Sequence, residues 1–375
     1  WELPYSLILN HTVEEIIENA KNAEKNQKRI SKLVNIVVEE LRLSLGDYSE
    51  PFFVPRKIKF EEFVKNYQFV FLGLHGGKGE DGTIQKILTD AGVKFNGSNP
   101  EVSFLCMDKF ATGEFIRSAG IPGVTIATQK VLPFKQLKHY LDSTELWDEL
   151  TRDLDAKTLI VKPKDDGCST GIAHLYAHED LGEYIKHMVR CDSHIPAGTL
   201  KNQDNILEMP GAVMKDILFE KFVETDNVQV KGNQLKYKRV SGMVEVTIGI
   251  LEENGKLHAL NPSITIAEGE VLSLEEKFQG GTGVNLTPPP QEIVNSKALA
   301  NAKSLVEKLA EQIGIKGYAR IDAFMNVKTG DLSVIEVNTL PGLTPSTVLY
   351  HQGLAENPQI FPKELLETII KNAGY

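Results

Sequence analysis

The chain has 375 residues, of which 41% are hydrophobic and 25% are charged, and this balance is typical of folded globular proteins. Lys and Arg total 41 and Asp and Glu total 51, so the formal net charge is −10. An acidic excess argues against general nucleic-acid binding, which needs a basic surface. Three cysteines without CxxC spacing argue against disulfides and zinc, and no apolar run approaches the roughly 18 residues of a membrane span. We therefore expect a cytoplasmic α/β protein that binds neither nucleic acid nor membrane.

The first third of the chain has the pattern of a helix followed by alternating strands and helices. Residues 11–45 carry apolar residues at helical spacing and predict an amphipathic helix. The next predicted elements are a strand over 68–74, a glycine-rich turn over 75–79, a helix over 83–91 and a strand over 93–95. This order predicts a βαβ unit with a parallel sheet. We expect a further helix over 103–119, with Ser103 as its N-cap and Gly120 as its stop.

From about residue 121 the pattern changes to strands separated by turns. Strands are predicted over residues 159–163, 172–176, 217–223, 244–251 and 335–338. The first two flank a turn of small residues and predict a hairpin whose loop approaches a ligand closely. A helix with an apolar stripe is predicted between Ile293 and Ile313. Two segments lack periodicity. Residues 224–242 are polar and irregular, which indicates an insertion. Residues 268–290 are typical of either a functional lid or a disordered segment.

Two loops in the first half of the chain carry polar residues beside predicted strands. Residues 75–82 (HGGKGEDG) place Glu80 and Asp81 before a helix, so they form either a capped turn or a substrate-binding loop. Lys162 directly follows an apolar strand and precedes the loop of small residues. This arrangement sets an ammonium beside backbone N–H groups that can cradle phosphate. Lys109 is a second candidate cation, and a solvated surface lysine is the alternative for both.

The strand predicted over 217–223 ends in the sequence FEKFV. Backbone groups at such a strand end can read the edge of an adenine, with Glu220 accepting a hydrogen bond from its amino group. The alternative is an ordinary strand end that binds no ligand.

The strongest candidate site joins two segments near the C-terminal end. Arg320 and Asp322 are two residues apart, so both side chains point to one face of a strand. Glu336 and Asn338 have the same spacing on a second strand. Two carboxylates and an amide oxygen together suit Mg²⁺, which prefers oxygen ligands and bridges substrate phosphates, while Arg320 can neutralise charge in a transition state. The alternative is a chance cross-strand charge pair, although buried carboxylates are costly unless paired.

In this order and spacing the motifs resemble the D-alanine–D-alanine ligase family of ATP-grasp enzymes. The motifs that carry the resemblance are LHGGKGEDGTIQ at 74–85, MDK at 107–109, VKPKDDGCSTG at 161–171, FEKFV at 219–223, EEKF at 275–278, ARID at 319–322 and EVNTLPGLTPST at 336–347. The resemblance implies an α/β fold of three domains, with a parallel-sheet N-terminal domain and ATP between a central and a C-terminal α+β lobe. We expect these domains at 1–102, 103–214 and 215–375, with the lid at 268–290.

The resemblance also implies roles for individual residues. The ATP-binding residues would be Lys109, Lys162, Glu220, Lys221, Phe222, Val223 and Lys277. Glu245 would bind the ribose, with Glu224 in reserve. Two Mg²⁺ ions, or Mn²⁺, would be held by Asp322, Glu336 and Asn338. The catalytic groups would be Arg320, Lys277, Ser169 and the backbone of Gly342. The substrate-binding residues would be His75, Glu80, Cys168, Phe278, Ser346 and Thr347.

Three features depart from the family pattern. The glycine-rich turn and glutamate that hold the first substrate's amine are not found in residues 1–66. Cys168 stands where the family usually has a serine that contacts the lid. Phe278 stands where dipeptide ligases have a tyrosine, and a phenylalanine there resembles members that use D-lactate and make depsipeptides.

The implied reaction has two steps, carried out by a cytoplasmic homodimer that supplies peptidoglycan synthesis. ATP would phosphorylate the carboxylate of one D-alanine, and the amine of a second D-alanine would displace the phosphate. Two alternatives stay open: a ligase with another acceptor such as D-lactate, and an ATP-binding module that no longer ligates.

Overall fold

The computed structural model divides the chain into two units, Trp1–Gln68 and Phe69–Tyr375. The residues it describes are 2–3, 13–22, 31–32, 35–36, 39–40, 57–140, 144–164, 170–210, 214–231, 234–266, 284–345 and 347–374. In the first unit, helix α1 (Val13–Lys21) confirms part of the helix predicted over 11–45, whose remainder falls largely outside the described residues. Helix α3 (Phe60–Asn66) ends this unit.

The second unit begins with the predicted βαβ pattern. Strand β1 (Phe69–Val70) pairs in parallel with β2 (Lys94–Phe95), and α5 (Thr83–Asp90) connects them. Strand β1 is shorter than the predicted run of 68–74. The expected turn contains one helical turn of its own, α4 (Gly77–Glu80).

The helix predicted over 103–119 is two helices, α6 (Pro100–Met107) and α7 (Lys109–Ala119). The N-cap of α6 is Asn99, whose Oδ1 accepts from Val102 N at 2.9 Å, so the prediction of Ser103 was wrong. Asp108 separates the helices because its Oδ1 accepts from the first backbone N–H groups of α7. Lys109 therefore begins a helix, and Gly120 ends it with a left-handed φ of 59°.

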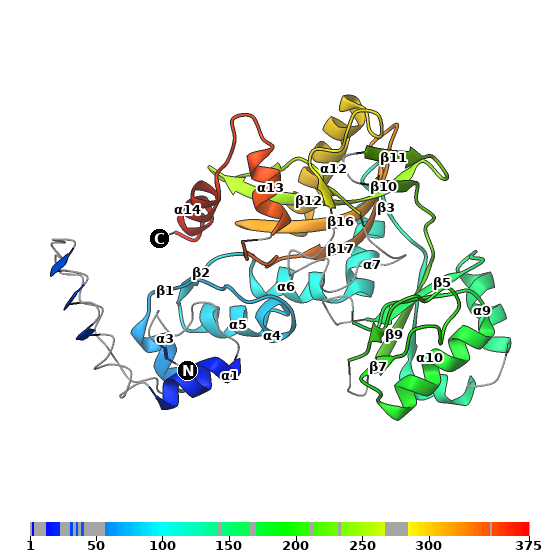
Figure 1. Cartoon of the computed structure of the whole chain (residues 1–375), viewed down its shortest axis with the longest axis horizontal. Helices are drawn as coiled ribbons and strands as arrows, with labels where there is room; N and C mark the ends of the chain where they lie inside the picture. Colours follow the sequence, from blue (N-terminus) through cyan, green and yellow to red (C-terminus); the bar gives the residue numbers. More distant parts are fainter. Residues whose placement is uncertain are drawn as a thin grey trace. The chain divides into compact units, whose positions relative to one another are not determined.

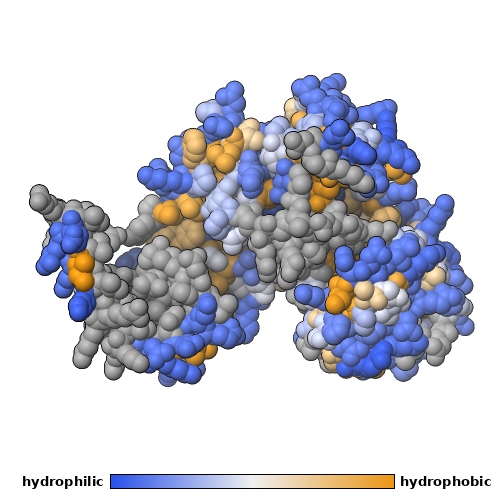
Figure 2. Space-filling model, viewed as in Figure 1, coloured by the Kyte–Doolittle hydropathy of each residue, from blue (hydrophilic) through white to orange (hydrophobic). Residues whose placement is uncertain are grey.

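One lobe of the second unit is a four-stranded antiparallel sheet in the order β4-β9-β5-β6. Its strands are β4 (Gln129–Pro133), β9 (Asp216–Lys221), β5 (Leu159–Pro163) and β6 (Ala173–Leu175). The accompanying elements are α8 (Phe134–Leu137), a 3-10 turn (Lys138–Tyr140), α9 (Glu145–Asp153), α10 (His178–Arg190), β7 (His194–Ile195) and β8 (Leu207–Glu208). Their apolar faces share a core with the sheet, while the visible surface over α9 and α10 is mostly hydrophilic (Figure 2). The hairpin predicted from the strands at 159–163 and 172–176 is confirmed.

The other lobe is a five-stranded sheet in the order β13-β12-β16-β17-β3, and α12 packs on its apolar face (Figure 1). The strands are β13 (Lys256–Ala259), β12 (Met243–Glu253), β16 (Tyr318–Asn326), β17 (Leu332–Asn338) and β3 (Val124–Ile126). The helices are α12 (Ser296–Ile313), α13 (Val348–Leu354) and α14 (Pro362–Asn372). Ile321, Ala323 and Met325 alternate toward the core beneath α12, so the residues between them point to the opposite face.

Residues 224–242, predicted to be irregular, instead contain an antiparallel hairpin of β10 (Asn227–Lys231) and β11 (Gln234–Lys238). Val228, Leu235 and Tyr237 pack against the core of the five-stranded lobe, which explains why this polar segment folds. Strands β14 (Ile264–Ile266) and β15 (Val284–Leu286) pair with each other and flank the predicted lid. Most of that lid lies outside the described residues. None of the described helices is long and apolar enough to cross a membrane.

Candidate functional site

The strongest candidate residues from the sequence meet on one face of the five-stranded sheet. Strands β16 and β17 pair so that Asp322 lies opposite Glu336 and Arg320 lies opposite Asn338. The two-residue spacing within each strand and this register bring all four side chains together, as the sequence pattern predicts.

A β-bulge in β17 determines which face Glu336 takes. Leu332 and Val334 point into the core, and strict alternation would bury Glu336 with them. The register shifts between Asp322 and Ala323, which leaves one extra residue, Ile335, in β17. Val337 therefore points into the core, and Glu336 emerges beside Asp322.

Arg320, Asp322 and Glu336 form a network of opposite charges. Arg320 Nη2 lies 3.0 Å from Asp322 Oδ2 and 3.9 Å from Glu336 Oε1. Burial disfavours the charged guanidinium, but the two nearby carboxylates outweigh it and raise the pKa of Arg320 above its usual value. Arg320 is 8% exposed and Asp322 5% exposed, so little water screens these charges. A strongly charged group held in this way can bind or stabilise an anion.

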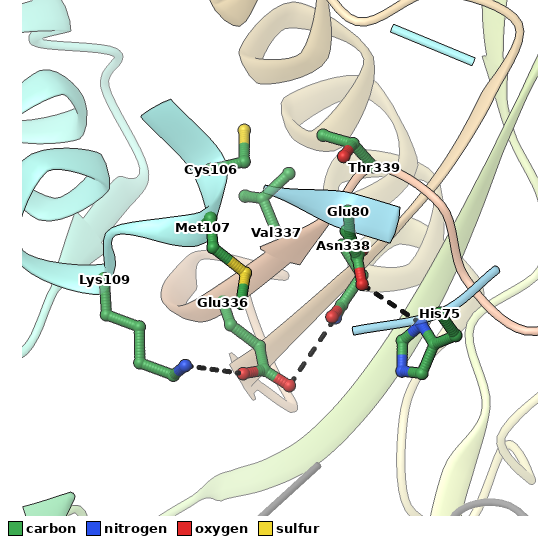
Figure 3. A pocket seen from close by; sticks show the side chains of 9 residues that line it. All are labelled: His75, Glu80, Cys106, Met107, Lys109, Glu336, Val337, Asn338 and Thr339. Atoms are coloured by element: carbon green, nitrogen blue, oxygen red, sulfur yellow. Dashed lines mark hydrogen bonds and ion pairs between the residues drawn. The ribbon is translucent and has the colours of Figure 1, made fainter. Parts of the chain in front are cut away.

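Lys109 reaches the same network from the first turn of α7. Its Nζ lies 3.8 Å from Glu336 Oε2, on the side of the carboxylate away from Asn338 (Figure 3). These residues border a small pocket that is partly open to solvent. Its lining residues are His75, Glu80, Cys106, Met107, Lys109, Glu336, Val337, Asn338 and Thr339.

Glu80 joins the glycine-rich loop to the segment that follows β17. One carboxylate oxygen accepts from Gly76 N and the other from Leu340 N, both at 3.1 Å. His75 Nδ1 lies 2.9 Å from Leu340 O and 3.1 Å from Glu80 Oε2. Because Glu80 is only 5% exposed, its bonds fix the two segments against each other. His75 and Glu80, both singled out from the sequence, thus lie at this site.

The second cluster of candidates lies in the four-stranded sheet. Lys162 Nζ is 2.7 Å from Glu220 Oε2, and both residues are buried. Gln129 Nε2 donates to the other oxygen of Glu220 at 2.6 Å. Sequence reasoning missed Gln129, since nothing in its local sequence indicates that it faces Glu220.

The neighbours of Glu220 point in other directions. Lys221 Nζ pairs with Asp155 at 3.0 Å on the exposed surface, so a ligand at Glu220 would meet the backbone of Lys221 rather than its ammonium. The Phe222 ring stacks on His174, with ring centroids 3.9 Å apart. Val223 follows directly and is half-buried.

The hairpin β10–β11 lies between Glu224 and Glu245 in the sequence, but its two ends are neighbours in the structure. Asp226 N donates to Met243 O at 2.7 Å, so the chain leaves and returns at the same point. Glu224 is exposed at the base of the hairpin. Glu245 lies two residues before Thr247 on β12, and both are half-buried on the face of β12 that bears the Asp322 network. This placement favours Glu245 over Glu224 as part of a site.

Thr247 is a second residue that sequence reasoning missed. Its Oγ1 donates to Asp322 Oδ1 at 2.9 Å, because β12 pairs with β16 in the register that sets Thr247 opposite Asp322. Only the pairing of the strands reveals this contact.

Five of the remaining candidates lie outside the described residues, namely Cys168, Ser169, Lys277, Phe278 and Ser346. Gly342 is described, and a Cβ added there would meet nothing within 4 Å, so its backbone borders open space. Thr347 directly precedes α13.

The donor set at β16 and β17 fits a hard cation that also binds ligand oxygens. Within the described ranges no group of three or more His, Cys, Asp or Glu side chains gathers as a metal site. Asp322 and Glu336 supply two carboxylates, a number suited to Mg²⁺ that is also held by substrate phosphates. Asn338 Nδ2 faces both carboxylates, at 3.3 and 3.5 Å, so ligation through its oxygen requires the amide to turn over.

Comparisons with known proteins agree with these features. Residues 8–98 match a family model described as D-ala D-ala ligase N-terminus, and residues 237–371 match one described as D-ala D-ala ligase C-terminus. A D-alanine–D-alanine ligase of Leptospira interrogans is 26% identical over 337 residues, which cover 84% of this chain and 80% of the relative. One from Carboxydothermus hydrogenoformans is 25% identical over 310 residues, which cover 82% and 81%.

Solved structures of similar proteins share the fold. The D-alanine–D-alanine ligase of Bacillus anthracis complexed with ATP has a TM-score of 0.56 and 23% identity, over 84% of this chain and 81% of that one. The VanG D-Ala:D-Ser ligase of Enterococcus faecalis has a TM-score of 0.57 and 19% identity, over 82% and 73%. At these identities the structures establish the fold rather than the substrate.

Proposed function

Because the chain belongs to the D-alanine–D-alanine ligase family, we propose that it uses ATP to join two molecules of D-alanine into D-alanyl-D-alanine, a peptidoglycan precursor. The observation that carries this proposal is the convergence of Arg320, Asp322, Glu336 and Lys109 on one buried face. That cluster combines anion-binding cations with the oxygen ligands of a metal, which phosphoryl transfer requires.

In the first step the carboxylate of one D-alanine attacks the γ-phosphorus of ATP, which gives D-alanyl phosphate and ADP. Lys109 and Lys162 neutralise phosphate charge, and Glu220 holds the Lys162 ammonium in place. The strand end at Lys221–Val223 reads the adenine through its backbone, and Glu245 accepts hydrogen bonds from the ribose. We assign Lys277 to the γ-phosphate and the lid at 268–290 to the exclusion of water, which would otherwise hydrolyse the acyl phosphate.

Asp322, Glu336 and Asn338 would hold two Mg²⁺ ions, or Mn²⁺ in their place. The metal supplies Lewis-acid charge to the phosphates when bound. Arg320 fixes the orientation of Asp322 and keeps a permanent positive charge beside the reacting groups.

In the second step the amine of another D-alanine attacks the acyl carbon of D-alanyl phosphate. The tetrahedral intermediate loses inorganic phosphate, and the amine loses a proton, which leaves the dipeptide. We assign stabilisation of the oxyanion to Arg320 and the backbone N–H of Gly342. Ser346 and Thr347 bind the carboxylate of the second substrate, while Ser169, Cys168 and Phe278 form the corner between the lid and the first substrate.

We also propose three domains, at 1–102, 103–214 and 215–375. The protein acts as a homodimer in the cytoplasm, where ATP is available. Family resemblance supports each of these assignments.

The test is phosphate release from ATP and Mg²⁺ with D-alanine, followed by mass identification of the product. D-alanine-dependent phosphate release with formation of the dipeptide is the expected result. ATP binding without any D-alanine-dependent turnover would contradict the proposal. In a mixture of D-alanine and D-lactate at neutral pH, a dominant ester product would instead assign D-lactate as the acceptor.

A further inference from the structure

The buried pair of Lys162 and Glu220 needs partners that hold its orientation. Lys162 is 3% exposed and Glu220 8% exposed, so water contributes little to either charge. A buried ion pair is stable only when further hydrogen bonds satisfy the remaining donors and acceptors. Whatever holds the second oxygen of Glu220 therefore also determines where the Lys162 ammonium lies.

Gln129 holds that second oxygen. It lies directly opposite Glu220 in the pairing of β4 with β9, and its Nε2 donates to Glu220 Oε1 at 2.6 Å. Its own Oε1 accepts from Arg117 Nη2 at 3.1 Å, so the amide is oriented at both ends. The contact series runs from Arg117 on α7 through Gln129 and Glu220 to Lys162 on β5. Each link is a hydrogen bond or an ion pair.

This series connects the two lysines assigned to ATP. Lys109 begins α7 and Arg117 lies in the last turn of the same helix, while Lys162 lies in the opposite lobe. The series therefore fixes the four-stranded sheet to the helix that carries the other cation.

We propose that Gln129 is a positioning residue for nucleotide affinity, because it holds Glu220 and through it the Lys162 ammonium in the orientation that binds ATP. This inference rests on the proposed function, which assigns Lys162 to the nucleotide. The side chain of Gln129 bonds Arg117 and Glu220, neither of which is assigned to the metal.

Gly113 provides a way to displace Gln129 without mutating it. Gly113 lies in α7, and a Cβ added there would overlap Gln129 Oε1 and lie 3.2 Å from Ile126 Cδ1. Alanine is otherwise the better helix former at such a position. Gly113→Ala therefore displaces the amide of the flexible Gln129 side chain from the position in which it bonds Glu220, while it favours the helix.

The experiment measures the dissociation constants of ATP and ADP by calorimetry for the full chain, Gln129→Ala, Gly113→Ala and the double variant. Each single variant is expected to bind nucleotide about tenfold more weakly, the size expected for a lost hydrogen bond to a charged group. The double variant is also expected to be about tenfold weaker, because Gly113→Ala has no effect once the Gln129 amide is gone. Gln136→Ala, at an exposed glutamine on α8, is the matched control and should bind as the unmodified chain does.

Steady-state kinetics separate positioning from a general structural defect. At saturating ATP, kcat and the KM for D-alanine should stay within about twofold of the unmodified values, while the KM for ATP rises. Unchanged nucleotide affinity in a folded Gln129→Ala protein would overturn the inference. A fall in kcat and a rise in the KM for D-alanine as large as the loss of nucleotide affinity would also overturn it. Should Gln129→Ala fail to fold, Gly113→Ala gives the same test. Absence of ATP binding by the unmodified chain would instead overturn the proposed function.

Discussion

Thr247 Oγ1 donates a 2.9 Å hydrogen bond to Asp322 Oδ1 across the paired strands β12 and β16. Asp322 also receives bonds from Arg320 and from Asn338. The backbone of Thr247 is fixed in turn, since its C=O accepts from Gln352 Nε2 at 2.7 Å. Thr247 thus fixes one oxygen of an assigned metal ligand.

Thr247→Val removes this hydroxyl with little change in shape. We expect the Mg²⁺ concentration for half-maximal activity to rise about tenfold, as is typical when a metal ligand loses an outer partner. Mn²⁺ binding in the presence of ADP, followed by electron paramagnetic resonance, should weaken similarly. Thr247→Ser keeps the hydroxyl and should restore both values, and equal weakening in Ser and Val variants would contradict the role.

Glu336→Gln removes one charge from the assigned metal site. Because Glu336 lies between Arg320 and Lys109, the two cations then repel each other with one fewer carboxylate between them. We expect ligase activity to fall about 10²–10³-fold at ordinary Mg²⁺, the loss typical of a group that stabilises a transition state. Ser333→Ala, earlier on the same strand, is the control, and full activity in Glu336→Gln would refute the metal assignment.

Gly249→Ala tests the packing of α13 against the sheet. A Cβ at Gly249 would lie 2.6 Å from both Gln352 Oε1 and Leu349 Cδ2. Gly249 N donates to that same Gln352 oxygen at 3.0 Å, so the helix cannot move away without losing the bond. We expect a loss of stability of about 1–3 kcal/mol, typical of overpacking, seen as a lower Tm. An unchanged Tm would contradict this prediction, because it would show that α13 shifts without a loss of stability.

Asp226→Asn tests how the inserted hairpin is held. Oδ1 of Asp226 accepts from the backbone N–H groups of Val240, Ser241 and Gly242, and Oδ2 accepts from Tyr237 OH at 2.7 Å. Burial opposes the charge, but these donors outweigh it and lower the pKa of Asp226. Burial, together with the hydrogen bond to the Asp226 carboxylate and its charge, raises the pKa of Tyr237 to about 12.

The lowered pKa of Asp226 determines how the stability of the fold changes with pH. The folded pKa of Asp226 lies below the roughly 3.9 of an unfolded chain, so the charge stabilises the fold above about pH 4. That contribution is lost as the pH falls through the folded pKa. Asp226→Asn should therefore accelerate hydrogen exchange of the amides of Val240, Ser241 and Gly242 about tenfold at pH 7. In acid, the stabilities of the variant and the unmodified protein should differ less than at pH 7. Equal exchange in both proteins at pH 7 would contradict this account.

The shared face of Arg320 and Asp322, and that of Glu336 and Asn338, was predictable because spacing of two is the period of a strand. The bulge at Ile335 was not predictable, and without it the alternation that begins at Leu332 buries Glu336 in the core. The contact between Gln129 and Glu220 spans 91 residues and depends on a strand register that local sequence does not encode.

The start of α6 and the hairpin β10–β11 were predicted wrongly, although the sequence contains a signal for each. Asn99 followed by Pro100 is an N-cap followed by a proline at the first helical position, which predicts the start of α6 better than Ser103. Residues 228–237 alternate apolar and polar side chains around a Gly-Asn pair, a hairpin pattern obscured by the high polarity of the segment.

The most direct test of the central claim follows oxygen from substrate to product. D-alanine carrying the heavy isotope of oxygen in its carboxylate is incubated with the protein, ATP and Mg²⁺, and the released phosphate is analysed by mass. An acyl-phosphate ligase transfers one heavy oxygen to phosphate for each dipeptide formed, and this is the result we predict. Dipeptide formed with unlabelled phosphate, or ATP hydrolysis without dipeptide, would contradict the account.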